Sequence, residues 1–349
     1  MKYIKTILPS ILSDISHIDE FKGKWLKLKE LAPDQLYNLQ YVATIASVGS
    51  STRIEGASLS DSEVDTLLSH IEKKSFQSRD EQEVAGYADV MTLVFESYSD
   101  ILITENYIKQ LHRILLRYSH KDHTHKGNYK THANSVEAFD PTGKSIGVIF
   151  ETATPFDTPF KMTALLDWYA VTITEKLQHP LLTIALFIVY FLAIHPFQDG
   201  NGRLSRILTT LLLLQVGYSY VPYCSLESII EENKNAYYKA LRTAQKTLDT
   251  DDSGMDRWLS FFIHCLKKQT TILEERVASE KTHALSSLPP LSITILNMAK
   301  QQSRITISDI LAVESVHRNT IKSHIKALVN KRYLDSHGTG KGTFYTRSR

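Results

Sequence analysis

The sequence has few of the features that mark secreted, membrane-spanning or fibrous proteins. Its 349 residues include only two cysteines, Cys224 and Cys265, which excludes a disulfide scaffold and a cysteine-rich zinc module. The longest uncharged apolar run, Leu181–Ile194, has 14 residues, whereas a membrane span needs about 20. Internal repeats and low-complexity tracts are also missing. We therefore expect a folded cytoplasmic protein with no membrane segment.

Charge is balanced over the whole chain but not along it. The net charge is +2, whereas residues 303–349 hold nine Lys or Arg and only three Asp or Glu. A Ser-Ser-Leu-Pro-Pro stretch precedes this basic segment and indicates a linker. The expected organisation is an N-terminal helical region (1–104), a catalytic core (105–282), a linker (283–290) and a small basic domain (291–349).

Apolar residues at three- and four-residue spacing predict helices over most of the chain. Residues 181–194 are apolar all round, which indicates a helix buried on every side. Residues 145–154 instead favour a β-hairpin or an extended flap. The fold class is therefore mainly α, a helical bundle with a small hairpin flap. Helices are expected at residues 28–46, 60–71, 89–98, 108–116, 162–177, 181–194, 204–216, 226–245 and 255–277.

Residues 291–349 predict three short helices followed by a glycine-rich β-wing. The helices are expected at 293–300, 306–311 and 316–330, and the wing at 336–346. This order resembles a winged helix-turn-helix. Its third helix would present His317, Arg318, Asn319, Lys322 and Lys326. Such a helix fits the major groove of DNA, but winged helices also dock proteins, so both kinds of partner stay open.

One polar segment, His195 to Arg206, joins two of the apolar helices. It reads HPFQDGNGRLSR and leads directly into the helix expected at 204–216. Helix N-termini present unpaired N–H groups and the positive end of the dipole, so they bind phosphates. Gly200 and Gly202 let the backbone approach an anion closely. A simple hairpin turn is the alternative, but hairpins need flanking strands and both flanks here are helical.

The side chains of this segment point to chemistry on a phosphate. Arg203 and Arg206 lie three residues apart on one helix face and can bind phosphate oxygens. Asp199 offers a hard oxygen ligand for Mg²⁺. His195 belongs to the residue type best suited to accept a proton near neutral pH. A base, a metal ligand and a phosphate cradle together predict phosphoryl or nucleotidyl transfer.

The segment also resembles a known family motif. HPFQDGNGRLSR matches H-x-F-x-D/E-G-N-G-R-x-x-R, the full motif of Fic-domain proteins, without a departure. Supporting similarity covers about residues 105–268 and includes Gly127-Asn128-Tyr129-Lys130, where the family often has Arg in place of the Lys. The resemblance implies transfer of AMP from ATP to a Ser, Thr or Tyr hydroxyl of a target protein, the chain itself included.

Roles for individual residues follow from this resemblance. It implies that His195 deprotonates the target hydroxyl, that Asp199 holds Mg²⁺, and that Phe197 anchors the loop. Tyr238 would lie beside the adenine, although it also fits an ordinary amphipathic helix. The residues implied to contact ATP are Glu55, His195, Gly200, Asn201, Gly202, Arg203, Leu204, Ser205, Arg206 and Tyr238.

Two further segments take roles from the same resemblance. The flap residues Ile149, Phe150, Glu151 and Thr152 would pair their backbone with an extended segment of the target. Ser51-Thr52-Arg53-Ile54-Glu55-Gly56 is similar to the Fic inhibitory motif S/T-x-x-x-E-G/N, with Ser51, Glu55 and Gly56 at its fixed positions. Glu55 would pair with Arg206 and so withhold it from the γ-phosphate. The plainer interpretation is that Glu55-Gly56 only ends a helix.

Two functions of different classes stay open at this point. The leading one is an ATP- and Mg²⁺-dependent protein adenylyltransferase restrained by Glu55. The alternative is a DNA-binding transcriptional regulator whose Fic core senses a nucleotide. His195 favours the enzyme, because a sensor needs the phosphate cradle but no base. The sequence does not define the target, exclude transfer of another phosphate-containing group, or decide whether the protein forms a homodimer.

Overall fold

The chain divides into two compact units. The computed structural model describes residues 1, 3–4, 6–28, 33–70, 76, 78–139, 145–248, 254–286, 288–302, 304–331 and 333–348. Unit 1 is Met1–Leu273 and unit 2 is Glu274–Arg349. In the ranges just given, no helix is long and apolar enough to cross a membrane.

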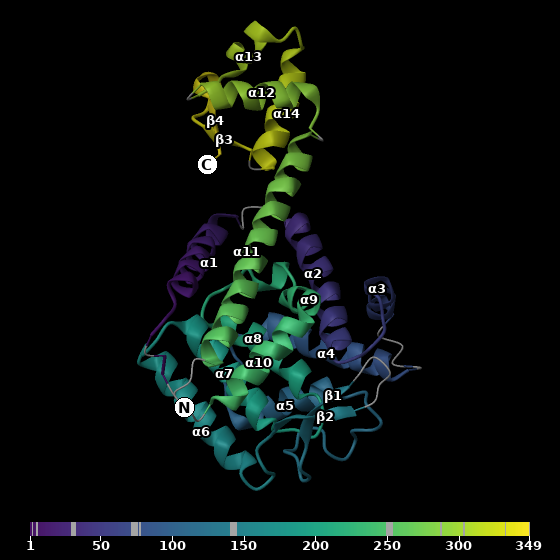
Figure 1. Ribbon diagram of the computed structural model, residues 1–349. Coiled ribbons are helices and arrows are strands. Elements are labelled where there is room, and N and C mark those ends of the chain that lie inside the picture. Colours follow the sequence, from purple (N-terminus) through teal and green to yellow (C-terminus); the bar gives the residue numbers. More distant parts are fainter. Residues whose placement is uncertain are drawn as a thin grey trace. The chain divides into compact units, whose positions relative to one another are not determined.

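Unit 1 is a bundle of helices with one small antiparallel sheet (Figure 1). The sheet pairs β1 (Ser135–Phe139) with β2 (Ser145–Glu151). The mainly α fold with a hairpin flap is therefore confirmed. The helices in chain order are α1 (Pro9–Leu28), α2 (Pro33–Ile54), α3 (Asp61–Ser69), α4 (Arg79–Ser97), α5 (Glu105–Leu115), α6 (Thr158–Thr174), α7 (Pro180–Ile194), α8 (Asn201–Gln215), η2 (Val221–Tyr223), α9 (Leu226–Glu232), α10 (Lys234–Lys246) and the first part of α11 (Gly254–Ser286).

The centre of unit 1 is the pair α7 and α8. All residues of α7 except Pro180 and Tyr190 are buried, and so are all residues of α8 except Gly202 and Gln215. The two helices pack against each other, with α6 on α7 and α4 on α8. The segment that joins α7 to α8 therefore begins and ends in the hydrophobic core, which fixes its position.

Several helix bounds differ from the sequence prediction, each for a local physical reason. Gly200 caps α8 with a φ of +78°, so Asn201, Gly202 and Arg203 form the first helical turn instead of the preceding loop. Helix α2 runs on to Ile54, because its small polar residues are buried against other helices rather than exposed in a loop. Asn233 caps both α9 and α10, which splits the helix predicted over 226–245.

Two other segments also depart from the prediction. Helix α1 was not among the expected ranges, although its buried residues recur at helical spacing: they are Ile11, Ile15, Ile18, Phe21 and Trp25. Helix α11 continues to Ser286, so it overlaps the linker predicted over 283–290. The change from unit 1 to unit 2 thus falls inside a continuous helix.

Unit 2 has its own hydrophobic core and the predicted order of elements. Beyond the end of α11 it holds α12 (Pro290–Gln301), α13 (Ile307–Val313), α14 (Arg318–Asn330), β3 (Leu334–His337), η3 (Gly340–Gly342) and β4 (Phe344–Arg347). Strands β3 and β4 pair antiparallel. The core of unit 2 includes Ile295, Ile305, Ile310, Ile321 and Leu328. Helices α13 and α14 with the turn between them therefore have helix-turn-helix order, followed by a hairpin.

Candidate active site

The side chain of Asn201 closes the loop between α7 and α8. Its Oδ1 accepts the N–H of Phe197 at 2.9 Å, and its Nδ2 donates to the Phe197 carbonyl at 2.7 Å. Asn134, just before β1, donates to the same carbonyl at 2.8 Å. Asn201 is 1% exposed, and its side-chain amide offers both a donor and an acceptor in one planar group. These three hydrogen bonds hold the backbone of the loop at Phe197 in place.

His112, on α5, contacts the loop at two residues, Phe197 and Asp199. Its ring stacks on Phe197 with 3.8 Å between centroids. Its Nδ1 accepts the N–H of Gly127 at 2.9 Å, so Nε2 carries the proton and donates to the Asp199 carbonyl at 2.9 Å. Burial lowers the pKa of His112 to about 4, which keeps the ring neutral. Sequence analysis missed this residue because its partner Asp199 lies 87 positions away.

His195 ends α7 in a left-handed conformation, with a φ of 52°. Such a backbone is uncommon for a residue other than glycine and is frequent at functional sites. Its Nδ1 lies 3.3 Å from the Leu192 carbonyl, and a carbonyl only accepts, so the proton is on Nδ1. Nε2 is left with a free lone pair. Burial, reinforced by Lys130, lowers the pKa of His195 to about 4, so the ring is a neutral proton acceptor at pH 7.

Lys130 ties the flap to the end of α7. Its Nζ donates to Asn134 Oδ1 and Thr152 Oγ1, both at 2.8 Å, and to the Ile194 carbonyl at 3.1 Å. Asn134 precedes β1 and Thr152 follows β2, so one ammonium group binds both ends of the hairpin beside His195. Lys130 is 3% exposed, and burial lowers its pKa to about 8. The position where the family often has Arg is thus structural.

Glu55 lies over the N-terminus of α8. A Cβ atom added at Gly202 would come within 2.2 Å of Glu55 Oε1, so the carboxylate fills the space that the missing side chain leaves. This space is at the positive end of the helix dipole, where anions are stabilised. The cradle predicted for a phosphate therefore holds the carboxylate of this chain.

The same carboxylate pairs with Arg206. Nη2 of Arg206 lies 2.8 Å from Glu55 Oε1 and 2.9 Å from the Ser51 carbonyl, and Nε donates to Ser51 Oγ at 2.8 Å. Arg206 is 4% exposed. Burial alone would lower the pKa of Arg206, but the Glu55 carboxylate reverses this and the pKa is raised. Gly56, with a φ of 105°, turns the chain after α2, so Glu55-Gly56 both ends a helix and contacts the arginine.

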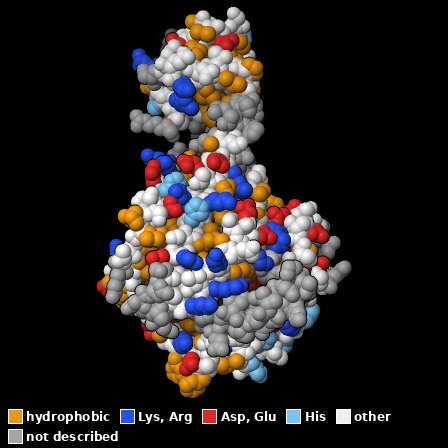
Figure 2. All heavy atoms as spheres, in the orientation of Figure 1, with side chains coloured by type: hydrophobic (Ala, Val, Ile, Leu, Met, Phe, Trp, Pro, Cys, Tyr) orange, Lys and Arg blue, Asp and Glu red, His pale blue; other side chains and the backbone are white. Residues whose placement is uncertain are grey.

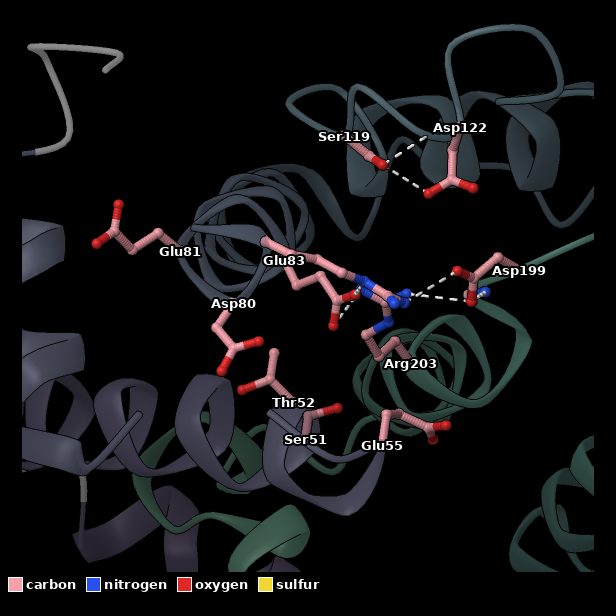
Figure 3. Close-up of polar contacts among 12 residues, drawn as sticks. Ser51, Thr52, Glu55, Asp80, Glu81, Glu83, Ser119, Asp122, Asp199 and Arg203 are labelled. Atoms are coloured by element: carbon pink, nitrogen blue, oxygen red, sulfur yellow. Dashed lines mark hydrogen bonds and ion pairs between the residues drawn. The ribbon is translucent and has the colours of Figure 1, made fainter. Parts of the chain in front are cut away.

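Arg203 and Arg206 do not share a partner, although the sequence places them on one helix face. Arg203 is buried and lies 3.0 Å from Glu83 of α4 and 3.3 Å from Asp199. Figure 3 shows Arg203 between Glu83 and Asp199, with Glu55 on the other side of α8. Burial would raise the pKa of Asp199, but Arg203 and the Gly200 N–H lower it below its ordinary value. Asp199 is therefore ionised.

The donor set at Asp199 fits a metal ion that arrives with its substrate. Oδ1 accepts the N–H of Gly200 at 2.6 Å and lies 3.3 Å from Arg203 Nη2. Among the residues that the structure describes, Oδ2 contacts only Arg79, at 3.5 Å. The part of the chain that the structure describes has no group of three or more His, Cys, Asp or Glu suited to a metal. Mg²⁺ is often held by one carboxylate plus substrate phosphates, and Asp199 Oδ2 suits that arrangement.

The remaining predicted residues fall into two groups. Leu204 packs in the core, and the Ser205 hydroxyl donates to the Gly202 carbonyl at 2.7 Å, so neither side chain faces the cradle. Tyr238, on α10, donates to the Ile54 carbonyl at 3.4 Å and therefore lies beside the end of α2. The structure thus brings Tyr238 to the same place as Glu55.

The flap lies beside the end of α7, to which Lys130 joins it. Ile149, Phe150 and Glu151 lie in β2, and the sheet of β1 and β2 has two strands, so each strand has one outer edge. Helix α10 contacts β2. Figure 2 shows Lys and Arg side chains on the face of unit 1 where α10 lies, and α10 contains no acidic residue. The flap therefore borders a positively charged surface.

Comparisons with known proteins agree with this fold and loop. Residues 102–213 match the model of the Fic/DOC family. The protein adenylyltransferase Fic of Drosophila willistoni is 29% identical over 220 residues, which cover 62% of this chain and 39% of that relative. A Fic domain containing signaling protein from Bacteroides thetaiotaomicron is 25% identical with a TM-score of 0.62, over 75% of this chain and 97% of the other.

A second solved structure extends the likeness to nearly the whole chain. A Fic family protein from Desulfovibrio desulfuricans is 22% identical with a TM-score of 0.62, and the match covers 99% of this chain and 98% of the other. The helical fold with its loop between α7 and α8 is thus a Fic-type fold. HPFQDGNGRLSR lies within residues 102–213, which match the Fic/DOC family model, so the resemblance predicted from this motif is confirmed. The match spans only 39% of the length of the Drosophila willistoni relative.

Proposed function

We propose that this chain is a protein adenylyltransferase that moves AMP from ATP to a Ser, Thr or Tyr hydroxyl of a protein. The observation that carries this proposal is the free Nε2 of His195, which ends α7 and begins the loop that leads into α8. The Leu192 carbonyl fixes the tautomer, and the loop that Asn201 closes fixes the position. A general base beside an anion cradle is what attack of a hydroxyl on a phosphate requires.

The reaction balances with the groups present. The target hydroxyl oxygen forms a bond to the α-phosphorus of ATP, and the bond from that phosphorus to the oxygen bridging to the β-phosphate breaks. Nε2 of His195 takes the hydroxyl proton, and pyrophosphate leaves. The N–H groups of the first turn of α8 and the guanidinium groups of Arg203 and Arg206 would bind the phosphates. Asp199 would hold Mg²⁺, which offsets charge on the phosphate oxygens.

Glu55 is the proposed brake on this reaction. Its carboxylate lies over Gly202 and pairs with Arg206 at 2.8 Å. A triphosphate placed in the cradle would meet a negative charge there, and it would have to compete with Glu55 and Ser51 for Nη2 and Nε of Arg206. We expect ATP to bind the braked form in a pose unsuited to transfer. Removal of the Glu55 side chain frees both the space and the arginine.

The test is the intact mass of the protein after incubation with ATP and Mg²⁺. We expect Glu55→Gly to gain the mass of one or more AMP groups by self-modification and the wild type to gain less. Glu55→Gly combined with His195→Ala should gain none. A gain that persists without His195 contradicts its role as base. Equal gains in wild type and Glu55→Gly contradict the brake.

Unit 2 supports a second candidate function, DNA binding. Helix α14 exposes Arg318, Lys322 and Lys326 at four-residue spacing on one face, and the second helix of a helix-turn-helix is the one that enters the major groove. Duplex DNA binding should weaken steeply with salt. We expect Lys322→Gln with Lys326→Gln to lower the salt slope by about two, and Lys268→Gln in unit 1 to leave it unchanged. Absence of binding at low salt rejects this function.

A further inference from the structure

Arg79 closes a ring of four charged side chains that includes the proposed metal ligand, Asp199. Its Nε lies 2.7 Å from Glu83 Oε1, and Glu83 Oε2 lies 3.0 Å from Arg203 Nη1. Arg203 Nη2 is 3.3 Å from Asp199 Oδ1, and Asp199 Oδ2 is 3.5 Å from Arg79 Nη2. The ring alternates in charge and joins α4 to α8 and the loop before it. Arg79 and Glu83 both lie outside the family motif.

The four members differ in how free they are to move. The side chain of Arg203 is 2% exposed, that of Glu83 10% and that of Asp199 29%. The side chain of Arg79 is 61% exposed. Three members are therefore held by the surrounding protein, and Arg79 covers them from the solvent side. Arg79 is therefore the member of the ring with the most freedom to move.

The two oxygens of Asp199 are used unequally. Oδ1 accepts the Gly200 N–H at 2.6 Å and also faces Arg203, so its lone pairs are occupied. Within the described ranges of the chain, Oδ2 has only the 3.5 Å contact with Arg79, which is longer than the 2.7–2.9 Å usual for a charge-assisted bond. Oδ2 is therefore the oxygen that can bind a metal ion, and Arg79 lies over it.

We propose that Arg79 is a placeholder cation, which neutralises Asp199 while no metal is bound and withdraws from Oδ2 when Mg²⁺ arrives with the nucleotide. This inference rests on the proposed function. A guanidinium and a metal ion repel each other as like charges, so Mg²⁺ bound at Oδ2 should displace the long contact that Arg79 makes there. Because Nε of Arg79 pairs with Glu83, the Nη2 group can move away from Asp199 while the side chain keeps its ion pair with Glu83.

The placeholder makes a distinctive prediction about metal dependence. Without a metal, Arg79 shields the phosphates of ATP from the Asp199 carboxylate, so its loss should weaken ATP binding. With Mg²⁺, Arg79 is an obstacle at Oδ2, so its loss should leave ATP binding unchanged or tighter. An arginine that simply binds a phosphate would instead help equally under both conditions.

The experiment measures the dissociation constant of a fluorescent ATP analogue in EDTA and in Mg²⁺, with Glu55→Gly as the parent. The readout is the dissociation constant in EDTA divided by the dissociation constant in Mg²⁺. We expect Arg79→Gln to raise the ratio by about fivefold. Arg117→Gln is the matched control, because Arg117 is 53% exposed and pairs with Asp89 at 2.9 Å, and it should leave the ratio unchanged. An unchanged ratio in Arg79→Gln overturns the proposal.

A second variant separates this inference from the proposed function. Asp199→Asn in the same parent should remove most of the effect of Mg²⁺ on binding. If Asp199→Asn leaves the Mg²⁺ effect intact, the metal assignment itself is wrong and the placeholder role fails with it. If Asp199→Asn abolishes the effect but Arg79→Gln does not change the ratio, the metal assignment stands and only the placeholder role is rejected.

Discussion

Glu55 and Arg206 lie 151 positions apart in the sequence, yet their side chains meet at 2.8 Å. The pair joins the end of α2 to the first turns of α8. Ser51 holds the arginine from one side through its hydroxyl and carbonyl, and Glu55 holds it from the other. The carboxylate also covers Gly202. One side chain thus fills the space over Gly202 and also pairs with Arg206.

The charge of Glu55, separate from its size, should account for part of the block. Glu55→Gln keeps the shape and one acceptor but removes the negative charge, whereas Glu55→Gly removes everything. We expect affinity for an ATP analogue to rise from wild type to Gln to Gly, with about tenfold, or 1.4 kcal/mol, between the extremes. Equilibrium titration checks the order, with Glu105→Gln as an exposed control. Equal affinity in all three forms would exclude electrostatic competition.

Arg53 should hold the brake in position through Glu231. Its Nε and Nη2 bind the two Glu231 oxygens at 2.7 and 2.9 Å, and its Nη1 binds the Leu59 carbonyl and Asp61, both at 2.9 Å. A bidentate pair of this kind fixes geometry as well as adding energy. We expect Glu231→Ala to raise self-modification by about two- to fivefold, because the turn that carries Glu55 is loosened.

Glu232 provides the control for this experiment. It adjoins Glu231 but is 63% exposed and pairs with Lys268 instead, so Glu232→Ala should leave self-modification unchanged. In the Glu55→Gly background, Glu231→Ala should add nothing, because no brake is left to loosen. A further increase in that background would show that Glu231 acts on the reaction by another route.

The rate of transfer should not fall below pH 6.5, as it would if His195 became protonated at its ordinary pKa. Burial lowers the pKa of His195 to about 4, so Nε2 remains unprotonated well below the ordinary value of 6.5. The rate of self-modification in Glu55→Gly, measured at saturating ATP from pH 5.5 to 7.5, should therefore be nearly flat. A fall of tenfold per pH unit below 6.5 would show that His195 titrates normally in the working enzyme.

His112 should make the fold sensitive to acid. Its pKa is about 4 when folded and 6.5 ordinarily, so the unfolded chain binds the proton more tightly. The stabilisation is thus complete above pH 6.5 and is lost as the pH falls toward 4, by up to about 3 kcal/mol. His195 contributes in the same direction. Denaturant unfolding at several pH values should show a shallower pH slope in His112→Gln than in wild type.

The sequence predicted most of the loop but little of its support. His195, Asp199 and Arg206 stand in one short segment, so their proximity needed no knowledge of the fold. The long apolar run also located the buried helix α7, because a helix that is apolar on all sides lies in the core. The sequence did not predict the partners of these residues. His112 and Glu83 lie on α5 and α4, and no motif surrounds either of them in the sequence.

What the sequence alone determined is the chemistry available: a histidine, a carboxylate, two arginines and two glycines around one helix start. The tertiary structure decided how these groups are used. It turned Arg203 toward Glu83 and Arg206 toward Glu55, although spacing along α8 placed both on one face. The reason is physical, since buried guanidinium groups must find carboxylates, and only the packing of α2 and α4 against α8 determines which ones they meet.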